Sequence, residues 1–101
     1  MKFERKRYLG FEVLCGEKLK RKDFSRVLWK ESLAFLGEML TSKSGLWLLH
    51  FENNRGILKC NVGYVDEVIC SLASIDQING KKANVLVLGV SGTMKSVKEM
   101  I

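Results

Sequence analysis

The sequence lacks proline altogether, and no linker, internal repeat or low-complexity tract interrupts it. The predicted elements therefore follow one another through short joints, as in a single compact domain spanning residues 1–101. A chain of 101 residues, 47% of them apolar, can bury a modest hydrophobic core. These features exclude a chain that is disordered over most of its length.

Long apolar runs are also absent. No stretch approaches the ~20 residues that a membrane-spanning helix needs. The first seven residues are mostly charged, and no apolar stretch with a cleavage site follows them, so the sequence predicts no signal peptide. We therefore expect a cytoplasmic protein with no membrane partner.

Cysteine and histidine are scarce, which limits the chemistry available to this chain. The chain has three cysteines: Cys15, Cys60 and Cys70. Their odd number and wide spacing argue against a disulfide framework and against a zinc site. We therefore expect three reduced cysteines in the core. His50 is the only histidine and has no carboxylate cluster with it, so Ser-His-acid catalysis is not expected. We predict no catalytic residue, no metal site and no cofactor bound by this chain.

Positive charge is concentrated near the start of the chain. Residues 1–30 hold ten Lys/Arg against four acids, a net +6, whereas residues 31–101 hold seven against seven. A local basic cluster suits a polyanion because each neutralised phosphate releases condensed counterions. From charge alone, a nucleic-acid partner and a merely solvated face are about equally supported. The RNA contacts predicted in this region are Arg5, Lys6, Arg7, Lys20, Arg21, Lys22 and Lys30.

Apolar and β-branched patterning predicts four strands. They are expected at residues 7–15, 46–52, 57–62 and 83–90. On the first of them, Leu9, Phe11 and Val13 point to one face. Residues 52–56 predict a hairpin turn between the second and third strands, because Asn and Gly tolerate the positive φ that such a turn needs.

Helical spacing of apolar residues predicts two long helices, over residues 21–40 and 64–76, and a short one from Met94 onward. Ser91 or Thr93 is expected to cap the short helix. The first helix is expected to be well buried through nine apolar side chains: Phe24, Val27, Leu28, Trp29, Leu33, Phe35, Leu36, Met39 and Leu40.

This order of elements predicts an α+β fold of the ferredoxin-like or RRM-like βαββαβ type: a four-stranded antiparallel sheet, two helices on one face and a short C-terminal helix. The fold does not settle function, because RNA-recognition domains, metal chaperones and metabolite sensors share it. A metal chaperone needs Cys-x-x-Cys after the first strand, which Cys15 does not begin. A metabolite-sensing homodimer needs a Gly-rich loop there, for which residues 17–22 are a poor substitute. That homodimer and a generic RRM-like RNA-binding domain remain as alternatives.

The second face of the predicted sheet must be covered, because residues 84–90 are apolar on both sides of their strand. The terminal helix is too short to be stable unless it docks, so either this helix or a protein partner covers the face. What the helix leaves open is an association surface. The predicted partner interface is Leu48, Ile57, Leu86 and Leu88.

Base stacking on the sheet is not expected. RNA-recognition domains stack bases on aromatic residues of two inner strands. Here the matching strand opens with Arg55-Gly56 but lacks the aromatics, which leaves Tyr8 as the only aromatic residue expected on the open face. RNA binding should therefore use phosphates and shape.

A second anion site is predicted where the last strand meets the terminal helix. Free backbone N–H groups and two hydroxyls at a helix start suit a phosphate, although an ordinary cap and turn is about equally supported. The predicted residues are Ser91, Thr93 and Lys95.

Four segments follow one another along the chain at a characteristic spacing: residues 7–12, 28–33, 36–38 and 86–95. Together they resemble archaeal ribonuclease P protein component 2, a family shared with eukaryotic ribonuclease P/MRP small subunits. The most specific block is residues 88–93 together with Lys95, and the resemblance covers nearly the whole chain.

The resemblance implies the ferredoxin-like fold and a non-catalytic role in ribonuclease P. Members of this family pair with ribonuclease P protein component 3 in a two-by-two heterotetramer, with component 2 at its centre. That complex binds the catalytic domain of the ribonuclease P RNA, works beside other ribonuclease P proteins and meets precursor tRNA indirectly. The RNA and its Mg²⁺ ions remove the 5′ leader of precursor tRNA, so no cofactor is implied for the protein itself.

Overall fold

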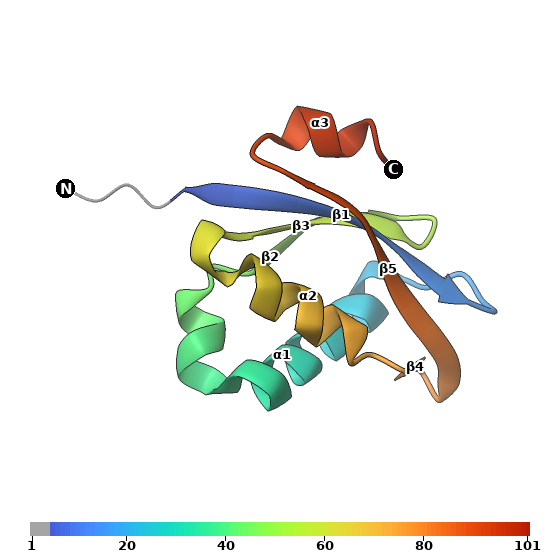
Figure 1. Ribbon diagram of the computed structural model, residues 1–101. Helices are drawn as coiled ribbons and strands as arrows, with labels where there is room; N and C mark the ends of the chain where they lie inside the picture. The colour runs from blue at the N-terminus through green and yellow to red at the C-terminus, as the bar shows by residue number, and fades with distance from the viewer. Residues whose placement is uncertain (1–4) are drawn as a thin grey trace.

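A computed structural model describes residues 5–101, so residues 1–4 of the predicted domain lie outside the described residues. A curled antiparallel sheet carries two helices on one face and a third helix on the other (Figure 1). The elements are β1 (Lys6–Cys15), α1 (Arg21–Lys43), β2 (Trp47–Glu52), β3 (Arg55–Asn61), the 3₁₀ turn η1 (Val62–Tyr64), α2 (Val65–Ala73), β4 (Gln77–Ile78), β5 (Lys81–Ser91) and α3 (Met94–Lys98).

The predicted α+β class is confirmed, but the sheet has five strands and not four, in the order β2-β3-β1-β5-β4. The additional strand, β4, is two residues long and pairs with the start of β5. Asn79 and Gly80 join the two strands with φ values of 54° and 78°. Asn and Gly tolerate the positive φ of such a turn, but a pairing of only two residues leaves no alternating pattern that would predict β4 from the sequence.

The main core lies between the sheet and helices α1 and α2. As predicted, Leu9, Phe11 and Val13 all point into it and are at most 2% exposed. At its centre, the Phe24 ring stacks against both Phe11 and Phe51, with centroid distances of 4.8 and 5.1 Å, and those two rings are 6.2 Å apart. One aromatic cluster therefore packs the apolar face of β1 against α1 and β2.

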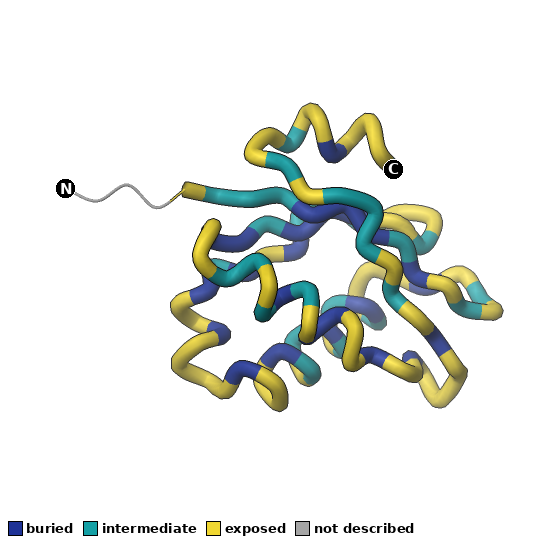
Figure 2. Tube along the Cα trace, viewed as in Figure 1, coloured by how far each residue is buried: buried dark blue, intermediate teal, exposed yellow. Residues whose placement is uncertain are grey.

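Helix α1 is less buried in its second half than in its first, so the prediction of a well-buried helix is wrong for most of its second half, although Leu36 is buried as predicted. Gly37 has a φ of 79°, which breaks the helix and turns the chain away from the first axis. The polar residues Ser32 and Thr41 are buried near the break, and the Thr41 hydroxyl donates to the Ser32 carbonyl at 3.1 Å. Four of the nine predicted core residues are 43–69% exposed: Leu33, Phe35, Met39 and Leu40. Most of the tube over the second half of α1 is accordingly yellow, the colour of exposed residues, in Figure 2.

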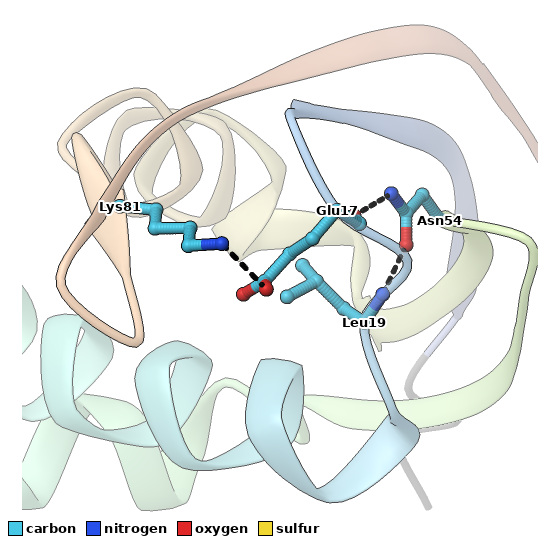
Figure 3. Close-up of polar contacts among 4 residues, drawn as sticks. All are labelled: Glu17, Leu19, Asn54 and Lys81. Atoms are coloured by element: carbon cyan, nitrogen blue, oxygen red, sulfur yellow. Dashed lines mark hydrogen bonds and ion pairs between the residues drawn. The ribbon is translucent and has the colours of Figure 1, made fainter.

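The β2–β3 turn is confirmed as a tight hairpin and also holds the segment that leads into α1. Asn53 and Asn54 adopt the positive φ values of 54° and 59° that the turn requires. The Asn54 side chain accepts from the Leu19 N–H and donates to the Glu17 carbonyl, both at 2.8 Å (Figure 3). Glu17 also pairs with Lys81 at 3.1 Å, so this corner joins β3, β5 and the start of α1.

Helix α3 covers the middle of the second sheet face, opposite α1 and α2 (Figure 1). Its Val97 side chain is fully buried over Gly10 of β1, where an added Cβ would lie 3.0 Å from Val97 Cγ1. Gly89 of β5 leaves similar room for Met100. Of the two predicted N-cap candidates, Ser91 and Thr93, the structure has Thr93 as the N-cap of α3. Its hydroxyl accepts a hydrogen bond from the Ser96 N–H at 3.4 Å.

Two residues of the predicted partner interface are placed differently from the expectation. Leu48 pairs with Leu58 and points into the main core, because an irregularity in the β2–β3 register separates it from His50. Ile57 does face α3, since it lies opposite Gly10, but it is fully buried. Leu86, 50% exposed, and the half-buried Leu88 remain accessible, and their contact with a partner stays a prediction.

The cysteines occupy three different environments. Cys60 is fully buried in the core, and this burial raises the pKa of its thiol to about 11. Cys15 is half-buried, whereas Cys70 is exposed on α2, so the interpretation of all three as core residues is wrong for Cys70.

Replacing Gly10 with valine is expected to release α3 from the sheet. A Cβ at this position would lie 3.0 Å from Val97 Cγ1 and 3.2 Å from Ile101 Cγ2, and valine adds two methyl groups beyond that Cβ. Because strands favour β-branched residues, valine should leave β1 itself intact. We expect the α3 amides to exchange at least about tenfold faster as this local unit opens, with β1 and β3 still protected. Hydrogen exchange checks this, and Gly16→Val is the matched control because no heavy atom lies within 4 Å of its added Cβ. Unchanged protection of α3 would show that the sheet accommodates the added bulk.

Candidate RNA interface

The basic residues that are close together in the sequence are separated along β1 in the structure. A ten-residue strand is about 33 Å long, so residues 5–7 and residues 20–22 start from opposite ends of it. Of the predicted contacts in this region, Lys6 and Arg7 are half-buried and the others are exposed. Their contact with RNA stays a prediction, but any such surface extends over two regions and not one.

The long side chain of Arg21 extends from the start of α1 toward the region around residues 5–7. Its Nη2 donates to the Leu48 carbonyl at 2.5 Å, which places the guanidinium beside edge strand β2. Lys6, from the other end of β1, donates to Asn61 Oδ1, and Asn61 Nδ2 in turn donates to the Lys43 carbonyl at 2.9 Å. Hydrogen bonds to neighbouring groups therefore hold both cations in place.

Both tryptophans of the chain lie between these two cations. One cavity, of about 400 Å³, is lined by Trp29 and Trp47 together with Lys6 and Lys59. A smaller one, of about 90 Å³, is lined by the same two tryptophans with Arg21. We call these the tryptophan cavities. Trp47 is not among the predicted site residues, because the expectation that Leu48 faces the open side of the sheet places its chain neighbour Trp47 on the core side, and the structure has the reverse.

Arg7 connects the first basic region with the second predicted anion site. An added Cβ at Gly92 would lie 3.3 Å from Arg7 Nη1, so the guanidinium lies against this part of the chain. The Ser91 hydroxyl accepts from the Thr93 N–H at 3.2 Å, and the Thr93 and Ser96 hydroxyls are 3.0 Å apart. These hydroxyls thus form a cap on a five-residue helix, and RNA contact by Ser91, Thr93 and the exposed Lys95 stays a prediction.

A third cavity, of about 480 Å³, contains the only histidine. His50 lines it with Glu12, Glu52 and Arg55, and the Arg55 Nε pairs with the Glu12 carboxylate at 3.3 Å. Within residues 5–101, no serine, threonine or cysteine lines this cavity, so a Ser-His-acid arrangement is not assembled in it. In the same described range, no group of three or more His, Cys, Asp or Glu is placed to hold a metal ion.

The geometry thus consists of cations spread over a small α+β domain, two tryptophans at a sheet edge and an apolar face covered by a terminal helix. Nearly the whole chain matches a known family: the model of the Rpp14/Pop5 family matches residues 7–101. The chain belongs to the Rpp14/Pop5 family.

No helix among the described residues is long and apolar enough to cross a membrane.

Other Rpp14/Pop5 relatives are similar over nearly the whole chain. Ribonuclease P protein component 2 of Pyrococcus furiosus is 38% identical over 97 residues, which cover 94% of this chain and 81% of that protein. Ribonuclease P protein component 2 of Methanosarcina mazei is 40% identical over 95 residues, with 94% and 82% covered. The sequence-based resemblance to component 2 is therefore confirmed.

The fold of this Rpp14/Pop5 protein is also found in a solved ribonucleoprotein. A chain in the cryo-EM structure of yeast ribonuclease MRP superposes with a TM-score of 0.73 and 14% identity, over 92% of this chain and 78% of that chain. At this identity the likeness concerns the fold alone, and it shows that the α+β fold described above occurs in another protein.

Proposed function

We propose that this chain is a non-catalytic protein subunit of ribonuclease P, which supports the catalytic RNA in removing the 5′ leader from precursor tRNA. One observation carries the proposal: relatives named ribonuclease P protein component 2 are 38–40% identical to this chain over 94% of its length. The net charge of +6 and the exposed cations supply the attraction to RNA that this role needs.

The proposal includes a defined set of partners. They are the ribonuclease P RNA, component 3 in a two-by-two heterotetramer, other ribonuclease P proteins and, indirectly, precursor tRNA. Mg²⁺ is required by the RNA of the holoenzyme, and the location is the cytoplasm. The exposed Leu86 and the half-buried Leu88 support a protein contact on the part of the sheet that α3 leaves open.

The chain's contribution to the reaction is electrostatic. Phosphates that converge around a catalytic centre repel one another, and this repulsion disfavours the compact RNA fold. Exposed Lys and Arg side chains neutralise part of that charge, so the compact fold becomes more populated at a given Mg²⁺ concentration. The protein shifts an equilibrium of the RNA and takes no part in breaking the bond.

Reconstitution tests this function. Ribonuclease P RNA and component 3 are assayed for precursor-tRNA cleavage at limiting Mg²⁺, with and without this chain. We expect this chain to raise the rate roughly 5- to 100-fold, the range of ordinary coupling between two binding events, and the gain to shrink at high Mg²⁺. The chain without RNA should cleave nothing.

Two results would contradict the proposal in different ways. An unchanged rate at limiting Mg²⁺ would remove the ribonuclease P assignment and favour a generic RRM-like RNA-binding domain, which binds RNA without activating it. Cleavage by RNA-free protein would contradict the non-catalytic role. A ligand-dependent shift in melting temperature with little affinity for RNA would instead indicate a metabolite-sensing homodimer.

A further inference from the structure

Trp47 belongs to a row of side chains that crosses the sheet. Lys59 of β3 pairs with Trp47 of β2 on one side and with Tyr8 of β1 on the other, and Tyr8 pairs with Ser91 of β5. Residues that pair directly across strands share a face. Their chain neighbours, among them Leu9 and the leucines at 48 and 58, point into the main core, so this row faces away from it. Tyr8 is therefore not the only aromatic residue on the open face.

Helix α3 leaves this row accessible. It packs over the neighbouring row, where Gly10 and Gly89 pair, and its buried Val97 lies against Gly10. Trp47 is 58% exposed at the edge of the sheet, although an indole is among the side chains that gain most from burial. A large, flat aromatic surface thus faces solvent beside the tryptophan cavities.

The charge around this surface has one sign. Lys6, Lys59 and Arg21 line the tryptophan cavities, and among the described residues no Asp or Glu lines either of them. The Arg21 guanidinium is held on the Leu48 carbonyl, so it stays beside Trp47. The fitting ligand is therefore both planar and anionic, which is the chemistry of a nucleotide.

We propose that Trp47 stacks on an unpaired base of an RNA strand, with Lys59, Lys6 and Arg21 neutralising the phosphates next to that base. Aromatic side chains in a positively charged groove bind single strands in this way, because every base offers a π face. Tyr8 extends the path across the sheet toward Ser91, where Arg7 and Gly92 meet. This inference rests on the proposed function only for the identity of the RNA.

A protein strand that pairs with edge strand β2 is the competing occupant. Such a strand is bound through backbone hydrogen bonds and does not require cations. Three cations line the tryptophan cavities, and no Asp or Glu of residues 5–101 lines them, which favours RNA over a strand.

The test uses the full chain with Trp29→Phe, which leaves Trp47 as the only tryptophan and keeps an aromatic ring at position 29. A short single-stranded oligoadenylate is expected to quench the Trp47 emission, whereas a fully paired duplex of equal length quenches it much less. In the wild-type chain, Trp47→Leu is expected to weaken oligoadenylate binding roughly 5- to 100-fold, as for the loss of one stacked base. Trp47→Tyr should retain most of the affinity.

Two further variants separate stacking from general effects. Phe35→Leu is the matched control, because Phe35 is 53% exposed on α1 and lines neither tryptophan cavity; its affinity should equal that of wild type. Lys59→Gln should lower the slope of log affinity against log salt by about one phosphate contact, whereas Trp47→Leu leaves that slope unchanged.

Equal oligoadenylate affinity of Trp47→Leu and Phe35→Leu would overturn the inference, as would equal quenching by duplex and single strand. If Trp47→Leu instead weakens binding to component 3 alone, the surface is a protein interface and the inference is wrong. Each of these results leaves the proposed function intact, provided that reconstituted cleavage is still stimulated. Conversely, stacking without stimulation would contradict the ribonuclease P assignment alone.

Discussion

Phe24→Ala is expected to lower the free energy of unfolding by about 3–5 kcal/mol, the usual cost of removing a buried phenylalanine ring. Phe24 is fully buried and stacks on Phe11 and Phe51, with centroids at 4.8 and 5.1 Å. No other ring can fill the gap, because both neighbours are fixed on strands β1 and β2. Since small domains have only about 5–15 kcal/mol of stability, this one change removes a large part of it. Urea unfolding followed by circular dichroism measures the effect.

Phe35→Ala provides the comparison for that prediction on the same helix. Phe35 is 53% exposed, so its replacement should change the stability by no more than about 0.5 kcal/mol. From the sequence, both phenylalanines belong to the same apolar face of the helix, and only the structure separates them. Similar losses for the two variants would mean that the second half of α1 is packed in solution as the periodicity predicts.

The sequence predicted the strands better than the helices, for a physical reason. Alternation along β1 depends only on adjacent residues, so Leu9, Phe11 and Val13 could be assigned to the core without knowing their partners. The periodicity of α1, by contrast, continues through Gly37 in the sequence, whereas the helix does not. Glycine is compatible with either outcome, and contacts from distant parts of the chain decide between them.

The candidate site was predictable only in its composition. The excess of positive charge was visible in the sequence, as were the hydroxyls of Ser91 and Thr93, whose contact with an anion stays a prediction. The position of Arg21 beside Trp47 was not, because it depends on a side-chain contact with the Leu48 carbonyl, 27 residues away in the chain. The burial of Leu48 was missed for a related reason: a local irregularity in strand pairing changes which side chains share a face.

Asn54→Ala is expected to lower the free energy of unfolding by about 2–4 kcal/mol, because two separate stabilising features are lost together. The amide side chain makes 2.8 Å hydrogen bonds to the Leu19 N–H and the Glu17 carbonyl, and both leave with it (Figure 3). The backbone at this position has a φ of 59°, which alanine adopts only with strain. Thermal and urea unfolding measure the total effect.

Asn54→Gly separates these two contributions, because glycine adopts the positive φ without strain, so the lost hydrogen bonds and the greater freedom of the unfolded chain remain as costs. We expect a smaller loss, of about 1–2 kcal/mol, while hydrogen exchange at the Leu19 amide should accelerate in both variants. Leu19 directly precedes the basic start of α1, so a loosened corner should also free Arg21 from the Leu48 carbonyl and weaken oligoadenylate binding. If glycine destabilises as much as alanine, the backbone strain of alanine at this turn is no larger than the entropy cost of glycine. If the Leu19 amide stays protected in both variants, the side chain of Asn54 does not hold the entry to α1, and the basic residues there are positioned by the helix alone.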